Sequence, residues 1–175
     1  MPDGPPDVVV VGAGNAALNA VLAAADAGAR VLVLEKAPQE ARGGNSYFSG
    51  GLFRFPYESV EHVEELTGEL SKAERESIDL GKYAEADFYG DLMRVSDGMS
   101  DPGLAETLVK NARPALAATR RWGVRWVLAI GRQSFKVDGR FRFFGRLSCA
   151  CVGAGKGLVD ALSYACERSG VTVDY

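Results

Sequence analysis

The sequence predicts an α/β fold that opens with a strand, a helix and a second strand, and three observations support this. Val8 to Val11 and Val31 to Leu34 are short apolar runs rich in β-branched residues, typical of strands in a parallel sheet that is buried on both faces. Residues 15–27 between them are rich in alanine and place apolar side chains at helical spacing. A glycine turn precedes this helix, and Gly28 follows it in the position expected of a helix C-terminus.

The middle of the chain is predicted to be an insertion of helices and a hairpin between the second and third strands of the sheet. Helices are expected within residues 59–70, 83–95 and 104–122, with the last one interrupted before Pro114, because proline lacks the N–H that a helix interior needs. The Asp138-Gly139 pair favours a two-residue hairpin that joins strands 134–137 and 140–144.

The end of the chain is predicted to return to the sheet, with a helix over residues 158–168 and a strand over 171–175. We therefore expect one domain over residues 1–175. It consists of the strand–helix–strand unit with its following loop (7–53), the insertion (54–150), and the returning helix and strand (151–175).

Composition and charge exclude several classes of function. The 175 residues are 47% hydrophobic and 25% charged, with a formal net charge of -3, so the charge gives no reason to expect nucleic-acid binding. The three cysteines lack C-x-x-C spacing and His62 is the only histidine, which predicts no disulfide framework and no metal site. The apolar runs are too short for a signal peptide or a transmembrane segment, so we expect a cytoplasmic location.

The first glycine-rich loop carries a nucleotide-binding pattern. Gly12-Ala13-Gly14-Asn15-Ala16-Ala17 matches G-x-G-x-x-G/A between a strand and a helix. Gly12 allows the tight turn, and Gly14 lets a pyrophosphate approach the backbone at the helix N-terminus. Glu35 ends the next strand, where its carboxylate can accept hydrogen bonds from ribose hydroxyls and would repel the 2′-phosphate of NADP. The pattern predicts dinucleotide binding but does not distinguish FAD from NAD; the alternative is a glycine turn without a ligand.

A second glycine-rich loop, residues 42–51 with the sequence RGGNSYFSGG, favours FAD. A nicotinamide cofactor gives no standard reason for glycines at this position. The longer FAD molecule runs past the first helix, so backbone N–H groups without side chains could touch its pyrophosphate and ring edge. The alternative is a flexible surface loop, which glycine and serine also allow.

These motifs together resemble the fumarate reductase/succinate dehydrogenase flavoprotein family. The resemblance rests on Glu35-Lys36, Gly43-Gly44-Asn45-Ser46 and Ser49-Gly50-Gly51, and it continues to residues 153–159. The first loop, with Asn15-Ala16-Ala17-Leu18, is most similar to the tricarballylate dehydrogenase branch. The resemblance implies a Rossmann-type FAD-binding core and an FAD-dependent oxidoreductase that transfers a hydride between a carboxylate-bearing substrate and flavin N5.

The resemblance also implies which residues bind the cofactor. Ser46 is the polar residue expected to face the flavin near N5. Some family members attach FAD through a histidine, but Gly44 occupies that position here, so we expect non-covalent FAD. The expected cofactor-binding residues are Gly12, Gly14, Asn15, Ala16, Glu35, Lys36, Gly43, Gly44, Asn45, Ser46, Gly50 and Gly51.

No catalytic residue is assigned, because the family's substrate-binding residues lie beyond the position of Tyr175 in much longer chains. The 175 residues alone are therefore expected to be incomplete for catalysis. The implied partners are a di- or tricarboxylate substrate and a protein that exchanges electrons with the flavin. Two alternatives stay open: a truncated FAD-binding segment without turnover, and a relative that acts on a steroid or tetrapyrrole precursor.

Overall fold

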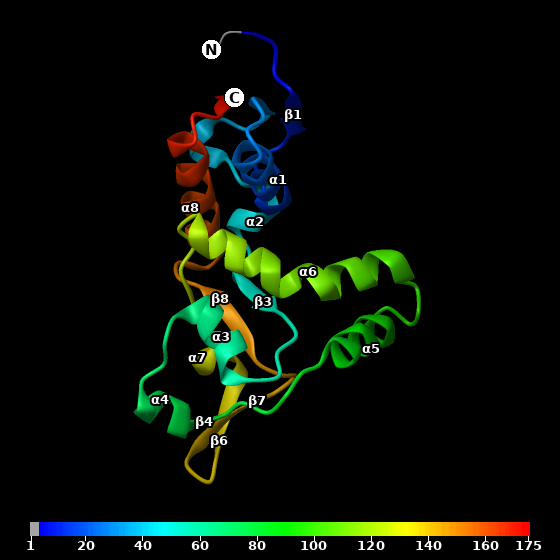
Figure 1. The fold of residues 1–175 in the computed structure, drawn as a ribbon, viewed down its shortest axis with the longest axis vertical. Helices are drawn as coiled ribbons and strands as arrows, with labels where there is room; N and C mark the ends of the chain where they lie inside the picture. The colour runs from blue at the N-terminus through cyan, green and yellow to red at the C-terminus, as the bar shows by residue number, and fades with distance from the viewer. Residues whose placement is uncertain (1–3) are drawn as a thin grey trace. The chain divides into compact units, whose positions relative to one another are not determined.

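The computed structural model describes residues 4–175, which divide into two compact units (Figure 1). The first unit contains residues 4–51, Arg121–Val124 and Cys151–Tyr175. The second unit contains Leu52–Arg120 and Arg125–Ala150. Among the described residues, no helix is both long and apolar enough to cross a membrane.

The first unit is built on a three-stranded parallel sheet in the order β1-β2-β9. Its strands are β1 (Val8–Val11), β2 (Val31–Leu34) and β9 (Thr172–Asp174). Helix α1 (Asn15–Asp26) connects β1 to β2 and contacts both strands, which confirms the predicted strand–helix–strand unit. Helix α8 (Ala154–Arg168) packs against α1 and leads into β9. The predicted α/β fold with a parallel sheet is therefore confirmed.

The two faces of this sheet differ in burial. Val31 and Val33 of β2 are buried, with exposed fractions of 7% and 0%. On β1, Val9 and Val11 are exposed, with 51% and 81% of their surface accessible. The prediction that the first strand is buried on both faces is therefore wrong, because side chains alternate along a strand and only the face that holds Val31 and Val33 is closed by packing.

Helix α8 starts at Ala154, four positions before the predicted start at residue 158. Its early start depends on Gly157, where an added Cβ would lie 2.0 Å from the carbonyl oxygen of Val152. The first turn of α8 thus lies so close to Val152 that only glycine fits at position 157. Glycine has a low helix propensity, so the sequence alone favoured a later start of the helix.

Two small sheets form the framework of the second unit. The first has the order β3-β8-β5, and the second has the order β4-β7-β6. The strands are β3 (Leu52–Arg54), β4 (Ile78–Asp79), β5 (Trp126–Leu128), β6 (Ser134–Val137), β7 (Arg140–Phe143) and β8 (Ser148–Cys151). The predicted hairpin is confirmed, since β6 pairs antiparallel with β7 and both Asp138 and Gly139 have positive φ angles, 49° and 81°. Strands β3, β4 and β5, which are two or three residues long, were not expected from the sequence.

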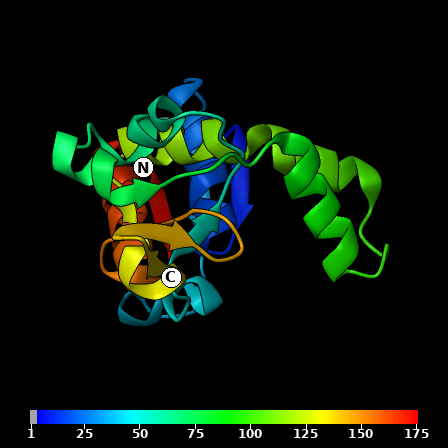
Figure 2. The ribbon, with the colours of Figure 1, turned by 90° about the horizontal axis from the view of Figure 1, so that it is seen from below.

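The second unit also contains helices, some of which contact these sheets. They are α3 (Val60–Thr67), α4 (Lys72–Ser77), α5 (Glu85–Val95), α6 (Pro102–Arg121) and the short α7 (Ile130–Gln133). Helices α5 and α6 lie side by side and are joined at one end (Figure 2). The expected interruption before Pro114 is wrong, because α6 continues through it and buries Val109 and Leu116 on either side. Packing of this face overrides the unfavourable proline, which costs about 3 kcal/mol in a helix interior.

Candidate functional site

The first glycine-rich loop leaves open backbone at the N-terminus of α1. Gly12 has a φ of 103°, and an added Cβ there would meet no atom within 4 Å. Gly14 is the N-cap of α1 and has no side chain to cap it. Its φ of -80° is ordinary, and an added Cβ would lie 3.4 Å from Ser46 Oγ, a normal contact distance. This arrangement suits an anionic group, because a helix N-terminus presents N–H donors and the positive end of its dipole.

Glu35 lies directly beside this loop and is already hydrogen-bonded to it. The amide of Ala13 donates to Glu35 Oε2 at 2.6 Å, and the amide of Ala37 donates to Glu35 Oε1 at 2.9 Å. The carboxylate therefore connects the end of β2 to the turn between β1 and α1. Each carboxylate oxygen can accept more than one hydrogen bond, so ribose hydroxyls could still bind here. The sequence analysis assigned Glu35 to the ribose alone and missed this second role.

Ser46 joins the two glycine-rich loops. The amide of Asn15, the first residue of α1, donates a hydrogen bond of 2.9 Å to Ser46 Oγ. The hydroxyl that was expected near flavin N5 thus has a partner at the helix N-terminus, and its position near N5 stays a prediction. Asn19, which the sequence analysis did not single out, holds Asn15 in place through bonds from its Nδ2 to Asn15 O (2.8 Å) and Oδ1 (3.0 Å).

The second glycine-rich loop is packed tightly against α8. An added Cβ on Gly43 would lie 2.7 Å from Val159 Cγ1, and one on Gly51 would lie 2.7 Å from the carbonyl carbon of Ala154. The amide of Gly155 donates to the carbonyl of Ser49 at 2.9 Å. Gly43 and Gly51 are therefore explained by packing even before a ligand is considered. Gly44 differs, because an added Cβ there would meet no atom within 4 Å.

Arg42 fixes the start of the second loop. Its Nη1 donates to Glu167 Oε1 at 3.2 Å and to the hydroxyl of Tyr175 at 3.1 Å. Burial works against the charge of this guanidinium, but the hydrogen bonds with Tyr175 and Glu167 outweigh it and raise the pKa of Arg42. The loop is thus tied to the end of α8 and to the residue after β9. The sequence analysis did not predict this link, because its partners lie more than a hundred residues away.

The remaining predicted residues have simpler surroundings. Lys36, Ala16 and Asn45 are exposed, and Gly50 is half-buried. The structure therefore brings together Gly12, Gly14, Asn15, Glu35 and Ser46 through the hydrogen bonds and contacts above. It places the other expected residues on the same two loops or directly after β2.

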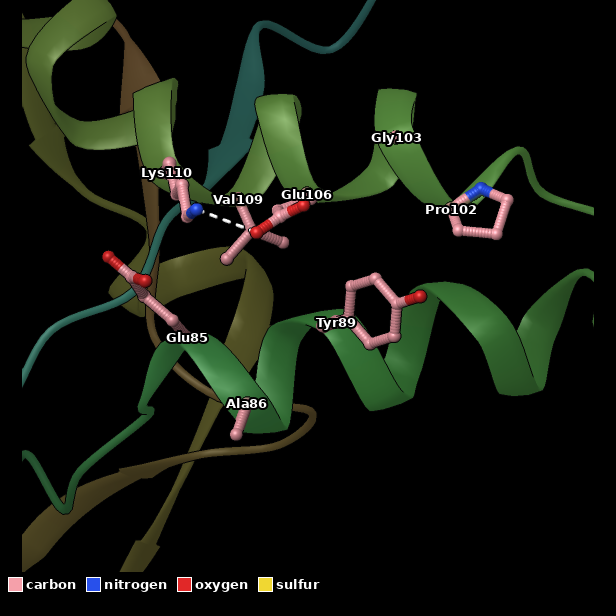
Figure 3. A pocket seen from close by; sticks show the side chains of 8 residues that line it. All are labelled: Glu85, Ala86, Tyr89, Pro102, Gly103, Glu106, Val109 and Lys110. Atoms are coloured by element: carbon pink, nitrogen blue, oxygen red, sulfur yellow. Dashed lines mark hydrogen bonds and ion pairs between the residues drawn. The ribbon is translucent and has the colours of Figure 1, made fainter.

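A separate groove of about 490 Å³ lies between α5 and α6 in the second unit (Figure 3). Lys110 and Glu106 form an ion pair of 2.6 Å on its α6 side, and the ring of Tyr89 points from α5 toward α6. None of the expected cofactor-binding residues lines this groove, so it is not part of the candidate site. Within residues 4–175, no group of three or more His, Cys, Asp or Glu side chains could hold a metal ion.

Residues 7–162 match the family model described as the FAD binding domain. The chain belongs to this family. A fumarate reductase (cytochrome) of Shewanella frigidimarina is 27% identical over 125 residues, which cover 71% of this chain and 18% of the relative. The chain thus spans about a fifth of the length of the curated relatives it matches. These matches confirm the resemblance to fumarate reductase/succinate dehydrogenase flavoproteins and identify FAD as the cofactor, whereas the tricarballylate branch is not tested.

Solved structures of flavoenzymes share the fold. The 3-ketosteroid-Δ4-(5α)-dehydrogenase of Rhodococcus jostii RHA1 has a TM-score of 0.68 and 18% identity, and the match covers 99% of this chain and 38% of that one. A flavocytochrome c3 fumarate reductase in an open conformation has a TM-score of 0.65 and 24% identity, covering 98% of this chain and 27% of that one. At these identities the likeness establishes the fold only.

The geometry of the two loops fits FAD. An added Cβ at Gly12 or Gly44 would meet no atom within 4 Å, and the N-cap residue of α1, Gly14, has no side chain. The Asn15 amide in the first turn is bonded to Ser46 Oγ. Glu35 adds carboxylate oxygens at one end of this surface, where it is bonded to Ala13. Open backbone at a helix N-terminus suits a phosphate, and a carboxylate suits ribose hydroxyls, so the residues present fit these two parts of FAD.

Proposed function

We propose that this protein is the FAD-binding part of a flavin-dependent oxidoreductase that transfers a hydride between flavin N5 and a carbon–carbon bond next to a carboxylate, with tricarballylate as the leading substrate. The observation that carries the proposed site is the hydrogen bond from the Asn15 amide to Ser46 Oγ, because it unites both glycine-rich loops at one helix N-terminus. The similarity to a fumarate reductase supports a carboxylate-bearing substrate. The matched segment is only 18% of the length of the fumarate reductase. The substrate and the turnover proposed here are therefore those of a whole protein of that kind.

The first loop and Glu35 would hold the adenosine diphosphate half of FAD. The backbone at Gly12, Gly14, Asn15 and Ala16 would line the phosphates, aided by the dipole of α1. The amides of Gly12 and Asn15 keep their hydrogen bonds to the Leu34 carbonyl and to Ser46 Oγ. Glu35 would accept from the ribose hydroxyls while keeping its bond to Ala13, so that sugar binding and loop conformation support each other.

The second loop and Lys36 complete the proposed site. Lys36 would lie near the ribose of the adenosine. When bound, FAD supplies the group that accepts or gives up a hydride. The loop residues proposed to run along the phosphates and the ring are Gly43, Gly44, Asn45, Ser46, Gly50 and Gly51. We propose non-covalent binding, because Gly44 has no side chain and His62, the only histidine, lies on α3 in the second unit.

A steroid substrate is the second candidate. Its support is the fold shared with two 3-ketosteroid dehydrogenases, one with a TM-score of 0.68 and one with 0.70. A third possibility, already open from the sequence, is a segment that binds FAD without turnover. A cytoplasmic setting and a separate electron-transfer partner also remain part of the proposal.

A spectroscopic experiment tests this proposal. The purified protein is titrated with FAD, and its visible absorption is recorded before and after anaerobic addition of tricarballylate or a 3-ketosteroid. We expect saturable FAD binding and release of the flavin on acid precipitation, which would not occur with a covalent bond. Loss of the flavin absorption after addition of one substrate supports an enzyme that acts on that substrate. A flavin-loaded protein that neither substrate reduces supports a binding segment, and a protein that takes up no FAD contradicts the proposed site.

A further inference from the structure

Phe48, in the middle of the second loop, is the most accessible aromatic side chain in the described part of the chain. Its exposed fraction is 85%, compared with 49% for Phe135 and 50% for Phe144 in the second unit. A phenyl ring is stabilised when it moves from water into an apolar environment. Phe48 therefore presents an apolar ring to solvent from within the second loop.

The backbone on both sides of Phe48 is fixed. Before it, Ser46 Oγ accepts the Asn15 amide at 2.9 Å. After it, the Ser49 hydroxyl donates to the Ser46 carbonyl at 2.8 Å, and the Ser49 carbonyl accepts the Gly155 amide at 2.9 Å. The exposed ring is thus held outward by a short segment anchored at two points, which lowers the entropy lost when a ligand covers it.

The neighbouring ring adds a further support. Tyr47 meets Phe48 edge to face, with ring centroids 5.3 Å apart and planes inclined by 70°. Lys156 at the start of α8 lies over the Tyr47 ring, with its Nζ 5.8 Å from the centroid. Tyr47 is half-buried, so it braces one edge of Phe48 and leaves the other surfaces of the phenyl ring available.

The position of Phe48 indicates what it contacts. It comes two residues after Ser46, whose hydroxyl marks the N-terminus of α1 where the diphosphate is proposed to bind. FAD continues from the diphosphate through a flexible polar chain to a flat aromatic ring. Within the second loop, apolar Phe48 follows polar Ser46 by two residues. Polar and apolar groups therefore follow each other in the same order on the loop and on the cofactor.

We propose that Phe48 packs against the isoalloxazine ring of bound FAD and so gives this site its preference for FAD over nucleotides that lack the ring. The inference rests on the proposed FAD site. It commits to the flavin ring as the occupant of the exposed face of Phe48.

The test compares Phe48→Ala with the wild type for two ligands, FAD and ADP, by calorimetric titration. ADP contains the adenosine diphosphate half of FAD but no flavin. We expect the substitution to weaken FAD binding about tenfold, equivalent to about 1.4 kcal/mol, and to change ADP binding less than about twofold. Phe48→Tyr should keep the FAD affinity, because it retains the ring. Phe144→Ala removes another exposed phenyl ring, outside the loop, and should change neither ligand.

Each other outcome has a distinct meaning. Equal losses of FAD and ADP affinity would show that the loop was disturbed, and would overturn the ring contact. Unchanged FAD affinity in Phe48→Ala, with normal binding by the wild type, would overturn the inference while leaving the proposed function intact. A wild type that binds FAD no more tightly than ADP would overturn the Phe48 inference alone, and a wild type that binds no FAD would overturn the proposed function as well.

Discussion

The first glycine-rich loop and the second differ in what surrounds their glycines. At Gly12 an added methyl group would meet no atom within 4 Å, and at Gly14 its nearest neighbour would be 3.4 Å away. At Gly43 and Gly51 the corresponding distances are 2.7 Å, and at Gly155, on the facing helix α8, the distance is 2.1 Å. The first loop therefore uses glycine to leave its backbone open, whereas the second uses it mainly to let two segments of chain touch.

A glycine pattern in the sequence does not show which glycines serve ligand binding and which serve packing. The difference in their surroundings distinguishes these two roles. Substitution in the first loop should reduce cofactor binding and leave the fold stable. Substitution at the contact between the second loop and α8 should reduce stability first. Gly44 is the exception within the second loop, because its surroundings are as open as those of Gly12.

The largest expected effect is the loss of stability in Gly155→Ala. The new Cβ would lie 2.1 Å from Ser46 O and 2.7 Å from Ser49 O, so loop or helix must move. We expect the free energy of unfolding to fall by about 3 kcal/mol, the upper range for overpacking, as measured by urea denaturation. Gly90→Ala is the control, since Gly90 also lies inside a helix but has no neighbour within 4 Å. That change should stabilise by about 0.5–1 kcal/mol, and the same sign for both variants would contradict the packing explanation.

Gly14→Ala should have the opposite effect, with weaker FAD binding and little change in stability. The position has ordinary φ and room for a methyl group, so the free energy of unfolding should change by less than about 1 kcal/mol. FAD binding should weaken at least about tenfold, because the methyl group occupies the space through which a phosphate approaches the backbone. FAD titration and urea denaturation of the same preparation check both parts. A large loss of stability without a loss of affinity would remove the contrast between the loops.

Glu35→Ala should weaken FAD binding by about 1–3 kcal/mol, the scale of hydrogen bonds to a charged group. Glu35→Gln keeps an oxygen for the Ala13 amide and loses the charge, so its effect should be smaller. Glu40→Ala, an exposed carboxylate five residues further on, serves as the control and should bind like the wild type. If Glu35→Ala binds FAD normally, the ribose assignment is wrong and the residue serves only to hold the loop.

The smallest expected effect is a dependence of stability on alkaline pH. Burial, with a smaller contribution from the Glu167 carboxylate, raises the pKa of the Cys166 thiol on α8 to about 11, from an ordinary value of 9.0. Above about pH 9 the unfolded chain releases this proton while the folded chain keeps it, so stability falls as pH rises from about 9 to 11. For this thiol the loss is about 1 kcal/mol at pH 10, measurable from urea midpoints at pH 8 and pH 10. Cys166→Ala should show a shallower decline; an identical decline would place the thiol in contact with water.

Several elements were predictable because their cause is local. The strand–helix–strand unit follows from periodicity, and the Asp138-Gly139 hairpin follows from two residues that tolerate positive φ. The pattern from Gly12 to Ala17 with Glu35 predicted a nucleotide site, and FAD is supported by the matched family. Errors arose where packing decides. Helix α6 runs through Pro114, α8 starts at Ala154, and Val11 is exposed, because each depends on which other segment covers it.

The sequence by itself determined the α/β core, the order of its main elements, and the chemistry of the residues of the proposed cofactor site, since these depend on local backbone preference and side-chain type. Only the tertiary structure decided which glycines leave the backbone open to a ligand and which allow two segments of the chain to pack closely. It also showed that Ser46 contacts Asn15, that Glu35 is bonded to Ala13, and that Arg42 reaches Tyr175. The physical reason is that steric contact and hydrogen bonding act between atoms that are close in space, and these partners lie 22 to 133 positions apart in the chain.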